Sequence, residues 1–289
     1  MRATMGATWR GALLGLWALA AAAVPAAAHA GGREGAQQAR VDHVALAAML
    51  VRDGHHERAR AELAEVDVAG EEVDRARYYT LLGLIDLHGN NHRDARRHFG
   101  RAIASGQSDP LVHVFVAQAS FGLGDHRGTI RALDRAGDAA RRLPGTYLLR
   151  CQAHWKRGRR QRAYLALHAG LRRFPASRQM RRHRVLLLVE LGLYQQAMRH
   201  GARYLSRAGA TAEEHGAIAE ALIKGGQHRQ AILILEAARL RFGGDARIVV
   251  QLARAYMTAG KLLTAARLFR QASFARPRFA FDAAELFRR

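Results

Sequence analysis

Glycine recurs through the chain at an identical spacing of 34 residues. A small residue follows each of these glycines five positions later. A fixed period of 34 residues is the length of one helix-turn-helix repeat, and such repeats stack so that each contacts only its neighbours. The period therefore predicts an all-α protein in which helices pair locally. The glycines are Gly124, Gly158, Gly192, Gly226 and Gly260, and the small residues are Thr129, Ala163, Ala197, Ala231 and Ala265.

Taking the small residue as position 20 numbers the positions of each repeat, and we call this numbering the repeat frame. The frame extends toward the N-terminus. Gly54 with Ala59, and Asn90 with Ala95, open the series, with two additional residues in the linker around 67–74. The frame then predicts seven repeats over residues 40–279. Their first residues are Arg40, Ala76, Pro110, Pro144, Arg178, Ala212 and Ala246.

Three positions of the frame carry structural meaning. Position 15, glycine or Asn90, is expected to take a positive φ between the first helix of each repeat (helix A) and the second (helix B). Positions 8 and 20 are small, which lets the two helices approach closely. Repeat five departs from this pattern, with Val185 at position 8, Gly201 at position 24 and Tyr204 at position 27. This leaves open looser packing in that repeat or a joint that bends differently.

Repeats two and seven carry the most complete pattern. The residues are Tyr79, Leu82, Gly83, Ala95, Phe99 and Ala102 in repeat two, and Leu252, Ala253, Tyr256, Gly260, Ala265, Phe269, Ala272 and Pro277 in repeat seven. This set resembles the tetratricopeptide repeat family. The resemblance implies an α-α superhelical solenoid of about seven 34-residue repeats that serves as a scaffold for other proteins. Residues 280–289 are expected to form a C-terminal capping helix, because terminal repeats need a cover.

The first thirty residues differ in composition from the repeats. Arg2 and Arg10 supply a positive region, residues 11–24 form an uncharged, mostly apolar run, and Ala28-His29-Ala30 is a small-x-small cleavage site. This pattern predicts a secretory signal peptide over residues 1–30, followed by a polar arm over 31–39. The alternative is an uncleaved leader that anchors the protein in a membrane.

The chain has one cysteine, Cys151, which cannot form an internal disulfide. It occupies position 8 of repeat four, so we expect a buried small apolar side chain and not a nucleophile. An exported chain without disulfides favours the periplasm or cell envelope over a disulfide-rich extracellular setting.

The charge of the chain is strongly basic. Without the leader and its two arginines, 44 basic and 24 acidic residues remain, a net charge of +20. Part of this charge forms a predicted basic band on helix B of repeats two and three, the convex side in the family. The band is either a solvated face or a surface for anionic polysaccharide, lipid head groups or an acidic partner, and nucleic acid is disfavoured because no stacking motif accompanies it. Its residues are Arg93, Arg96, Arg97, Arg131 and Arg135.

The resemblance also implies a concave groove lined by helix A. Phe121 and Trp155 are 34 residues apart, as are Gln118 and Gln152, so each pair is expected to stack in successive repeats. Such a groove suits a peptide segment of a partner protein. The competing interpretation is that Phe121 and Trp155 only complete packing between repeats. The predicted groove residues are Gln118, Phe121, Gln152, Trp155, Lys156, Arg182, Lys224 and Arg254.

Histidine is abundant, but His56, His92, His126 and His228 share position 17, where packing against a neighbouring helix is expected. We therefore predict no metal site, no cofactor and no catalytic residues, since no phosphate loop, nucleophile elbow or metalloprotease motif is present. The expected function is an exported, periplasmic scaffold or adaptor for an envelope machine of secretion, pilus or exopolysaccharide export. The alternatives are a direct binder of an anionic polymer or lipid surface, and an accessory subunit that presents substrate to an envelope enzyme.

The leader gives the first testable prediction. Cleavage after Ala30 should leave a mature protein that begins at Gly31, because the small residues of Ala28-His29-Ala30 fit a signal peptidase. N-terminal sequencing of the protein from an envelope fraction checks this. A membrane-bound product that still begins at Met1 would show that the leader is an anchor.

Overall fold

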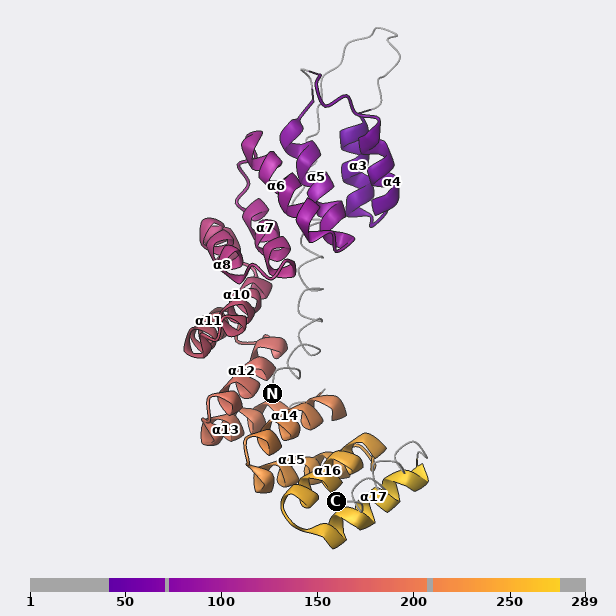
Figure 1. Ribbon diagram of the computed structural model, residues 1–289, viewed down its shortest axis with the longest axis vertical. Coiled ribbons are helices and arrows are strands. Elements are labelled where there is room, and N and C mark those ends of the chain that lie inside the picture. Colours follow the sequence, from indigo (N-terminus) through magenta and orange to yellow (C-terminus); the bar gives the residue numbers. More distant parts are fainter. Residues whose placement is uncertain (1–41, 71–72, 207–209, 276–289) are drawn as a thin grey trace. The chain divides into compact units, whose positions relative to one another are not determined.

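The computed structural model describes residues 42–70, 73–206 and 210–275. Within these ranges the chain forms fifteen helices and no strand, and fourteen of the helices make seven antiparallel pairs (Figure 1). This confirms the predicted all-α fold of about seven helix-turn-helix repeats. The predicted leader, polar arm and C-terminal capping helix lie outside the described residues. None of the described helices has both the length and the apolar character needed to cross a membrane.

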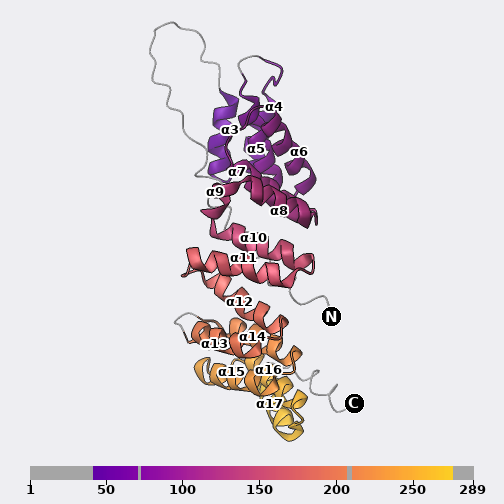
Figure 2. The ribbon, with the colours of Figure 1, turned by 90° about the vertical axis from the view of Figure 1, so that its left-hand side faces the viewer.

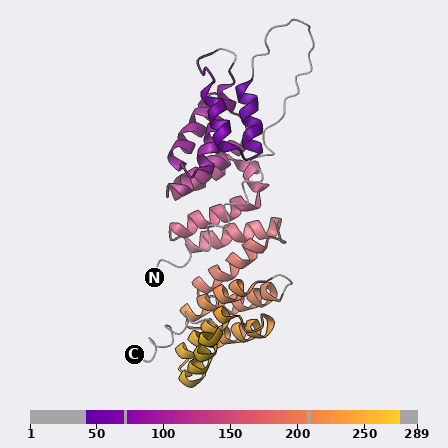
Figure 3. The same cartoon turned by 90° about the vertical axis from the view of Figure 1, so that its right-hand side faces the viewer.

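The chain divides into two compact units, with the boundary between Gly170 and Leu171. The first unit contains α3 (His43–Arg52), α4 (His56–Ala64), α5 (Arg75–His88), α6 (His92–Ala104), α7 (Leu111–Gly122), α8 (His126–Arg135), α9 (Gly137–Arg141), α10 (Pro144–Lys156) and most of α11 (Arg160–Arg173) (Figure 2). The second contains α12 (Arg178–Glu190), α13 (Tyr194–Leu205), α14 (Ala212–Lys224), α15 (His228–Arg241), α16 (Ala246–Thr258) and α17 (Leu262–Ala275), whose orange to yellow ribbons lie side by side (Figure 3).

Local sequence explains where the helices begin. The side chain of Asp74 accepts a hydrogen bond from the backbone of Arg77 at 2.9 Å, which satisfies a donor that the first turn of α5 would otherwise leave unpaired. Thr211 and Glu214 form a reciprocal capping box at the start of α14.

The seven residues at position 15 make the turn between helix A and helix B as predicted. The six glycines have φ between 71° and 83°, and Asn90 has φ 60°. Only residues that tolerate the left-handed region can occupy this position, because a side chain there normally clashes with the following carbonyl.

Positions 8 and 24 face each other inside a repeat. In repeat two the ring of Phe99 covers Gly83 so closely that an added methyl group would lie 2.6 Å from Cε1 of the ring. Repeat five reverses the sizes: a methyl group on Gly201 would lie 3.4 Å from Cγ1 of Val185. The larger residue has changed sides, so a glycine still faces a larger residue across the helix pair.

Repeat three differs from the prediction of two helices per repeat. Its helix B ends at Arg135, and a separate short helix, α9, follows. Gly137, the first residue of α9, has φ 51°, so the backbone leaves the α-helical region there.

Neighbouring repeats contact each other through position 17 of one and position 13 of the next. The rings of His56 and His88 lie 3.8 Å apart. His92 covers Gly122, where a methyl group would lie 2.2 Å from Cδ2 of the imidazole. These contacts confirm that the recurring histidines are packing residues.

The buried carboxylate of Asp86 links the first two repeats. The carboxylate of Asp86 on α5, 2% exposed, accepts from Nη2 of Arg60 on α4 and is bonded to Nδ1 of His98 on α6, both at 2.6 Å. The period of the sequence did not reveal these contacts.

Asp86→Ala should lower the free energy of unfolding by about 2 kcal/mol, because it removes the acceptor that Arg60 and His98 share. Asp94→Ala is the matched control, since the ion pair that Asp94 makes with Arg97 at 3.0 Å is exposed. The control should change the same quantity by less than about 0.5 kcal/mol. Urea denaturation of the full chain measures the free energy of unfolding of both variants. An equal loss in the two would show that the contacts of Asp86 do not stabilise the fold.

His183 gives a prediction about pH. It is 3% exposed on α12, and its Nδ1 is bonded to the carbonyl oxygen of Gln179 at 2.7 Å. Burial, reinforced by Arg182, lowers the pKa of His183 from 6.5 to about 4. Between these two values the unfolded chain binds more protons than the folded one, so stability falls as pH falls.

Acidification from pH 7 to pH 4 should therefore cost about 3 kcal/mol through His183 alone. Comparing the unfolding free energies of wild type and His183→Gln at the two pH values isolates the contribution of His183, because the other groups titrate in both proteins. An identical pH dependence in the two proteins would mean that His183 is not held neutral by burial.

Candidate binding surface

Two aromatic side chains occupy equivalent places at the ends of α7 and α10. Phe121 is half-buried, and its ring centroid lies 5.1 Å from that of His126. Trp155 is also half-buried, and the guanidinium carbon of Arg160 lies 5.7 Å from its ring centroid. In both repeats the aromatic residue at position 12 is covered by a cationic or aromatic side chain at position 17. The rings are thus held in place while part of their surface stays exposed.

The two amides predicted beside these rings differ in exposure. Gln118 on α7 is half-buried, but Gln152 on α10 is only 3% exposed, and its Nε2 has no hydrogen-bond partner among the described residues. The structure therefore differs from the expectation that Gln152 offers its amide to a partner. The reason is that residues 151–154 of α10 are all buried, so this turn is covered on every side.

Basic residues surround the turn of repeat four. Lys156 is exposed. Burial lowers the pKa of His126, and the charges of Lys156 and Arg157 lower it further. Arg157 itself has a lowered pKa, through loss of hydration and then through repulsion by neighbouring guanidinium groups. We call this group the turn cluster, and its residues are Arg127, Lys156, Arg157, Arg159 and Arg162.

The other predicted groove residues lie in the second unit, on three separate helices. Arg182 on α12 is half-buried, and its Nε and Nη2 lack partners in the described part of the chain. Lys224 on α14 is exposed and donates to Glu220 at 2.5 Å. Arg254 on α16 is exposed. These three residues stay predictions as contacts for a partner.

The predicted basic band lies on exposed positions of α6 and α8. Arg96 reaches Asp125 at 3.4 Å, and Arg97 reaches Asp94 at 3.0 Å. Exposed ion pairs of this kind are weak and leave most of the positive potential in place. Arg93, Arg131 and Arg135 are also exposed.

Cys151 is fully buried, as predicted, and burial raises the pKa of its thiol to about 12. A thiol that stays protonated at neutral pH is a poor nucleophile.

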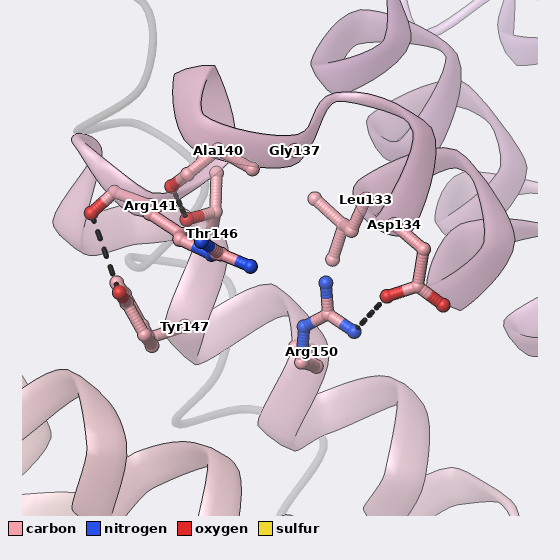
Figure 4. Close-up of a pocket in the computed structure, with 8 residues that line it drawn as sticks. All are labelled: Leu133, Asp134, Gly137, Ala140, Arg141, Thr146, Tyr147 and Arg150. Carbon is pink, nitrogen blue, oxygen red and sulfur yellow. Dashed lines mark hydrogen bonds and ion pairs between the residues drawn. The ribbon is translucent and has the colours of Figure 1, made fainter.

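Two cavities were not predicted from the sequence. The first, of about 270 Å³, lies in the first unit at the entry to α10. Figure 4 shows Arg150 and Asp134 pointing toward each other there, with an Nη1–Oδ1 distance of 2.5 Å. The hydroxyl of Thr146 donates to the carbonyl oxygen of Ala140 at 2.5 Å. The lining residues are Leu133, Asp134, Gly137, Ala140, Arg141, Thr146, Tyr147 and Arg150.

The second cavity, of about 280 Å³, lies in the second unit beside α12 and α13. Its lining combines basic and apolar side chains. The only sequence signal shared by both cavities is an arginine at position 7 of repeats four and five, Arg150 and Arg184. The lining residues are Leu171, Pro175, Arg181, Arg184, His200, Arg203 and Tyr204.

Comparison with known proteins adds evidence on the fold. No protein-family model matches the sequence, and no curated protein matches it. Among solved structures, the C-terminal part of a repeat protein from Cytophaga hutchinsonii matches with a TM-score of 0.68 at 10% identity, covering 81% of this chain and 95% of that one. A tetratricopeptide repeat protein from Parabacteroides merdae gives 0.58 at 14% identity, covering 85% and 97%.

PilW, described as a widely conserved type IV pilus biogenesis factor, gives a TM-score of 0.54 at 13% identity, covering 73% of this chain and 98% of PilW. At these identities the likeness concerns the fold. This likeness, together with the seven helix pairs and the positive φ of the residue in each turn, shows that this chain has the fold of the tetratricopeptide repeat proteins.

Proposed function

We propose that the protein is an exported scaffold or adaptor that binds a protein or peptide segment during assembly of an envelope machine. The observation that carries this proposal is the pair of equivalent, partly exposed aromatic rings, Phe121 and Trp155, each held by its position-17 neighbour. Aromatic residues next to cations are frequent energetic centres of protein interfaces.

The basic surroundings favour a partner with acidic character. Lys156 and Arg157 follow Trp155 directly in the sequence, and the pKa of Arg157 is lowered by loss of hydration and then by repulsion from Arg159, Arg127 and Arg162. An acidic or phosphorylated segment that packs an apolar side chain on Trp155 would relieve this repulsion. Such complementarity speeds association and excludes basic competitors.

Two observations support a role in the envelope. The leader has the pattern of a signal peptide, and the fold resembles that of PilW, a pilus biogenesis factor. On this support we propose that the protein works in the periplasm or cell envelope, in a machine of secretion, pilus or exopolysaccharide export.

The second candidate function is direct binding of an anionic polysaccharide or lipid surface. The density of guanidinium groups in the turn cluster and the exposed basic band favours it. Contacts of this kind weaken steeply as salt screens them. Recognition of a peptide through the aromatic rings should survive moderate salt.

Trp155→Ala should weaken binding of a partner isolated from envelope extract by about thirtyfold, because truncating an interface centre commonly costs 2 kcal/mol or more. Tyr164→Ala on α11 is the matched control: it removes a half-buried aromatic side chain of the same repeat and should leave affinity nearly unchanged. Surface plasmon resonance with the purified partner, at two salt concentrations, measures affinity and rates.

A second variant separates the two functions. Neutralising Arg96, Arg97, Arg131 and Arg135 together should slow association and reduce its salt dependence, with little change in the lifetime of the complex. If this variant loses binding while Trp155→Ala binds normally, the scaffold model fails and the anionic-polymer function replaces it.

A further inference from the structure

The turns between helix A and helix B of repeats three and four lie together at one edge of the first unit. Burial, and then the charge of Lys156, lowers the pKa of His126, so position 13 of repeat four is close to position 17 of repeat three. The turn of repeat four is tight, because α10 ends at Lys156, α11 begins at Arg160, and Gly158 between them has φ 71°. The turn cluster gathers at this edge, with Arg127 from repeat three and Lys156, Arg157, Arg159 and Arg162 from repeat four.

The positive charge of this edge has little local counter-charge. None of the five cations of the turn cluster makes an ion pair with a residue in the described part of the chain. The one acid in the two turns is Asp125, which caps α8 by accepting from the backbone of Gly128 at 2.7 Å and lies 3.4 Å from Nη1 of Arg96. Loss of hydration lowers the pKa of Arg157, and repulsion by other guanidinium groups of the turn cluster lowers it further.

Exposed apolar side chains gather at the turns as well. Leu123 follows α7 at position 14 of repeat three and is 37% exposed, next to the turn residue Gly124. Among the described residues, eight large apolar residues are exposed, and four of them fall at positions 14 to 18, which are only five of the 34 positions. A basic face that is merely solvated would show no such excess. The four are Leu123, Leu193, Leu262 and Leu263.

We propose that the turns of repeats three and four dock the protein on an anionic lipid surface, with the turn cluster against the head groups and Leu123 at their boundary with the acyl chains. Anionic head groups attract a polybasic patch, and an apolar side chain beside it adds burial that a soluble polyanion does not offer. The neighbouring Trp155 is half-buried, and tryptophan is enriched where a membrane meets water.

This inference rests on the second candidate function, which it narrows to a lipid surface and to these two turns. It is independent of the protein partner proposed for Phe121 and Trp155. The partner experiment with Trp155→Ala contains no lipid, so either proposal can fail while the other stands.

Co-sedimentation with vesicles of phosphatidylcholine, with and without phosphatidylglycerol, tests the docking. The chain is used from Gly31, the form expected after cleavage, because the apolar leader would itself enter lipid. We expect capture by the anionic vesicles that weakens as salt rises, because the cations are exposed to screening. Equal capture by neutral and anionic vesicles, or no capture by either, would overturn the proposal.

Fluorescence shows whether the turns themselves meet the lipid. Trp9 and Trp17 lie in the leader, so Trp155 is the one tryptophan of the chain from Gly31. Its emission should move to shorter wavelength with anionic vesicles, because the exposed part of the indole leaves water. A protein that sediments with vesicles while its emission is unchanged would bind through another surface, and the proposed edge would be wrong.

Paired arginine variants test the turn cluster. Arg159→Gln with Arg162→Gln should weaken vesicle binding by about twenty-five-fold, since each cation near an anionic surface contributes about fivefold. The matched control, Arg131→Gln with Arg135→Gln, removes the same charge from helix B of repeat three and should weaken binding by less than about threefold. All four side chains are exposed, so the fold is not at risk. Equal weakening by the two pairs would assign the binding to the general basic surface and overturn the site.

Leu123→Gln separates a lipid surface from a soluble polyanion. It removes the apolar contact and keeps the charge, so vesicle capture should fall by about fivefold, while binding of soluble polygalacturonate should not change. Leu165→Gln is the matched control, because Leu165 is an exposed leucine of α11 outside the turn, and circular dichroism checks the fold of both variants. Binding of polygalacturonate that requires Arg159, without vesicle capture, would assign the turn cluster to an anionic polysaccharide and overturn the lipid proposal.

Discussion

The fold depends on how closely helix A and helix B approach inside each repeat. The residues at position 20 are at most 3% exposed in all seven repeats, which is possible only because they are small. Across the same interface, position 8 meets position 24, and in both repeat two and repeat five a glycine on one side faces a larger residue on the other. In repeat two the glycine is Gly83, at position 8, and the larger residue is Phe99. In repeat five the glycine is Gly201, at position 24, and the larger residue is Val185. The constraint therefore acts on the pair of positions, and a motif that fixes one residue at a time describes it incompletely.

The junctions between repeats are less uniform than the repeats themselves. Position 17 contacts position 13 of the next repeat through a ring stack at His56, through close cover of a glycine at His92, and through a hydrogen bond of 3.0 Å between His228 and Thr258. Because the contact between positions 17 and 13 differs from one junction to the next, the cavities between repeats can be lined by different residues. A solenoid can in this way carry a specific site without altering its backbone plan.

The sequence was sufficient for features that the 34-residue period controls directly. These are the helix pairs, the left-handed turns including Asn90, and the burial of Cys151. It was insufficient where side chains from different repeats meet. Asp86 sits at position 11 of repeat two, and its partner Arg60 sits at position 21 of repeat one, so the period alone gives no reason to pair them. The burial of Gln152 likewise depends on the residues that surround one turn of α10. A repeat consensus does not describe the surroundings of a single turn.

The net charge of the chain is a poor guide to where an anion would bind, because local compensation differs from place to place. Arg150 and Arg178 each have a carboxylate partner, Asp134 and Glu214, which offsets part of their charge. Arg157 of the turn cluster instead has a lowered pKa, first through loss of hydration and then through the neighbouring guanidinium groups of Arg159, Arg127 and Arg162. It is this uneven distribution of counter-charge, more than the excess of arginine, that distinguishes a binding place from a solvated basic face.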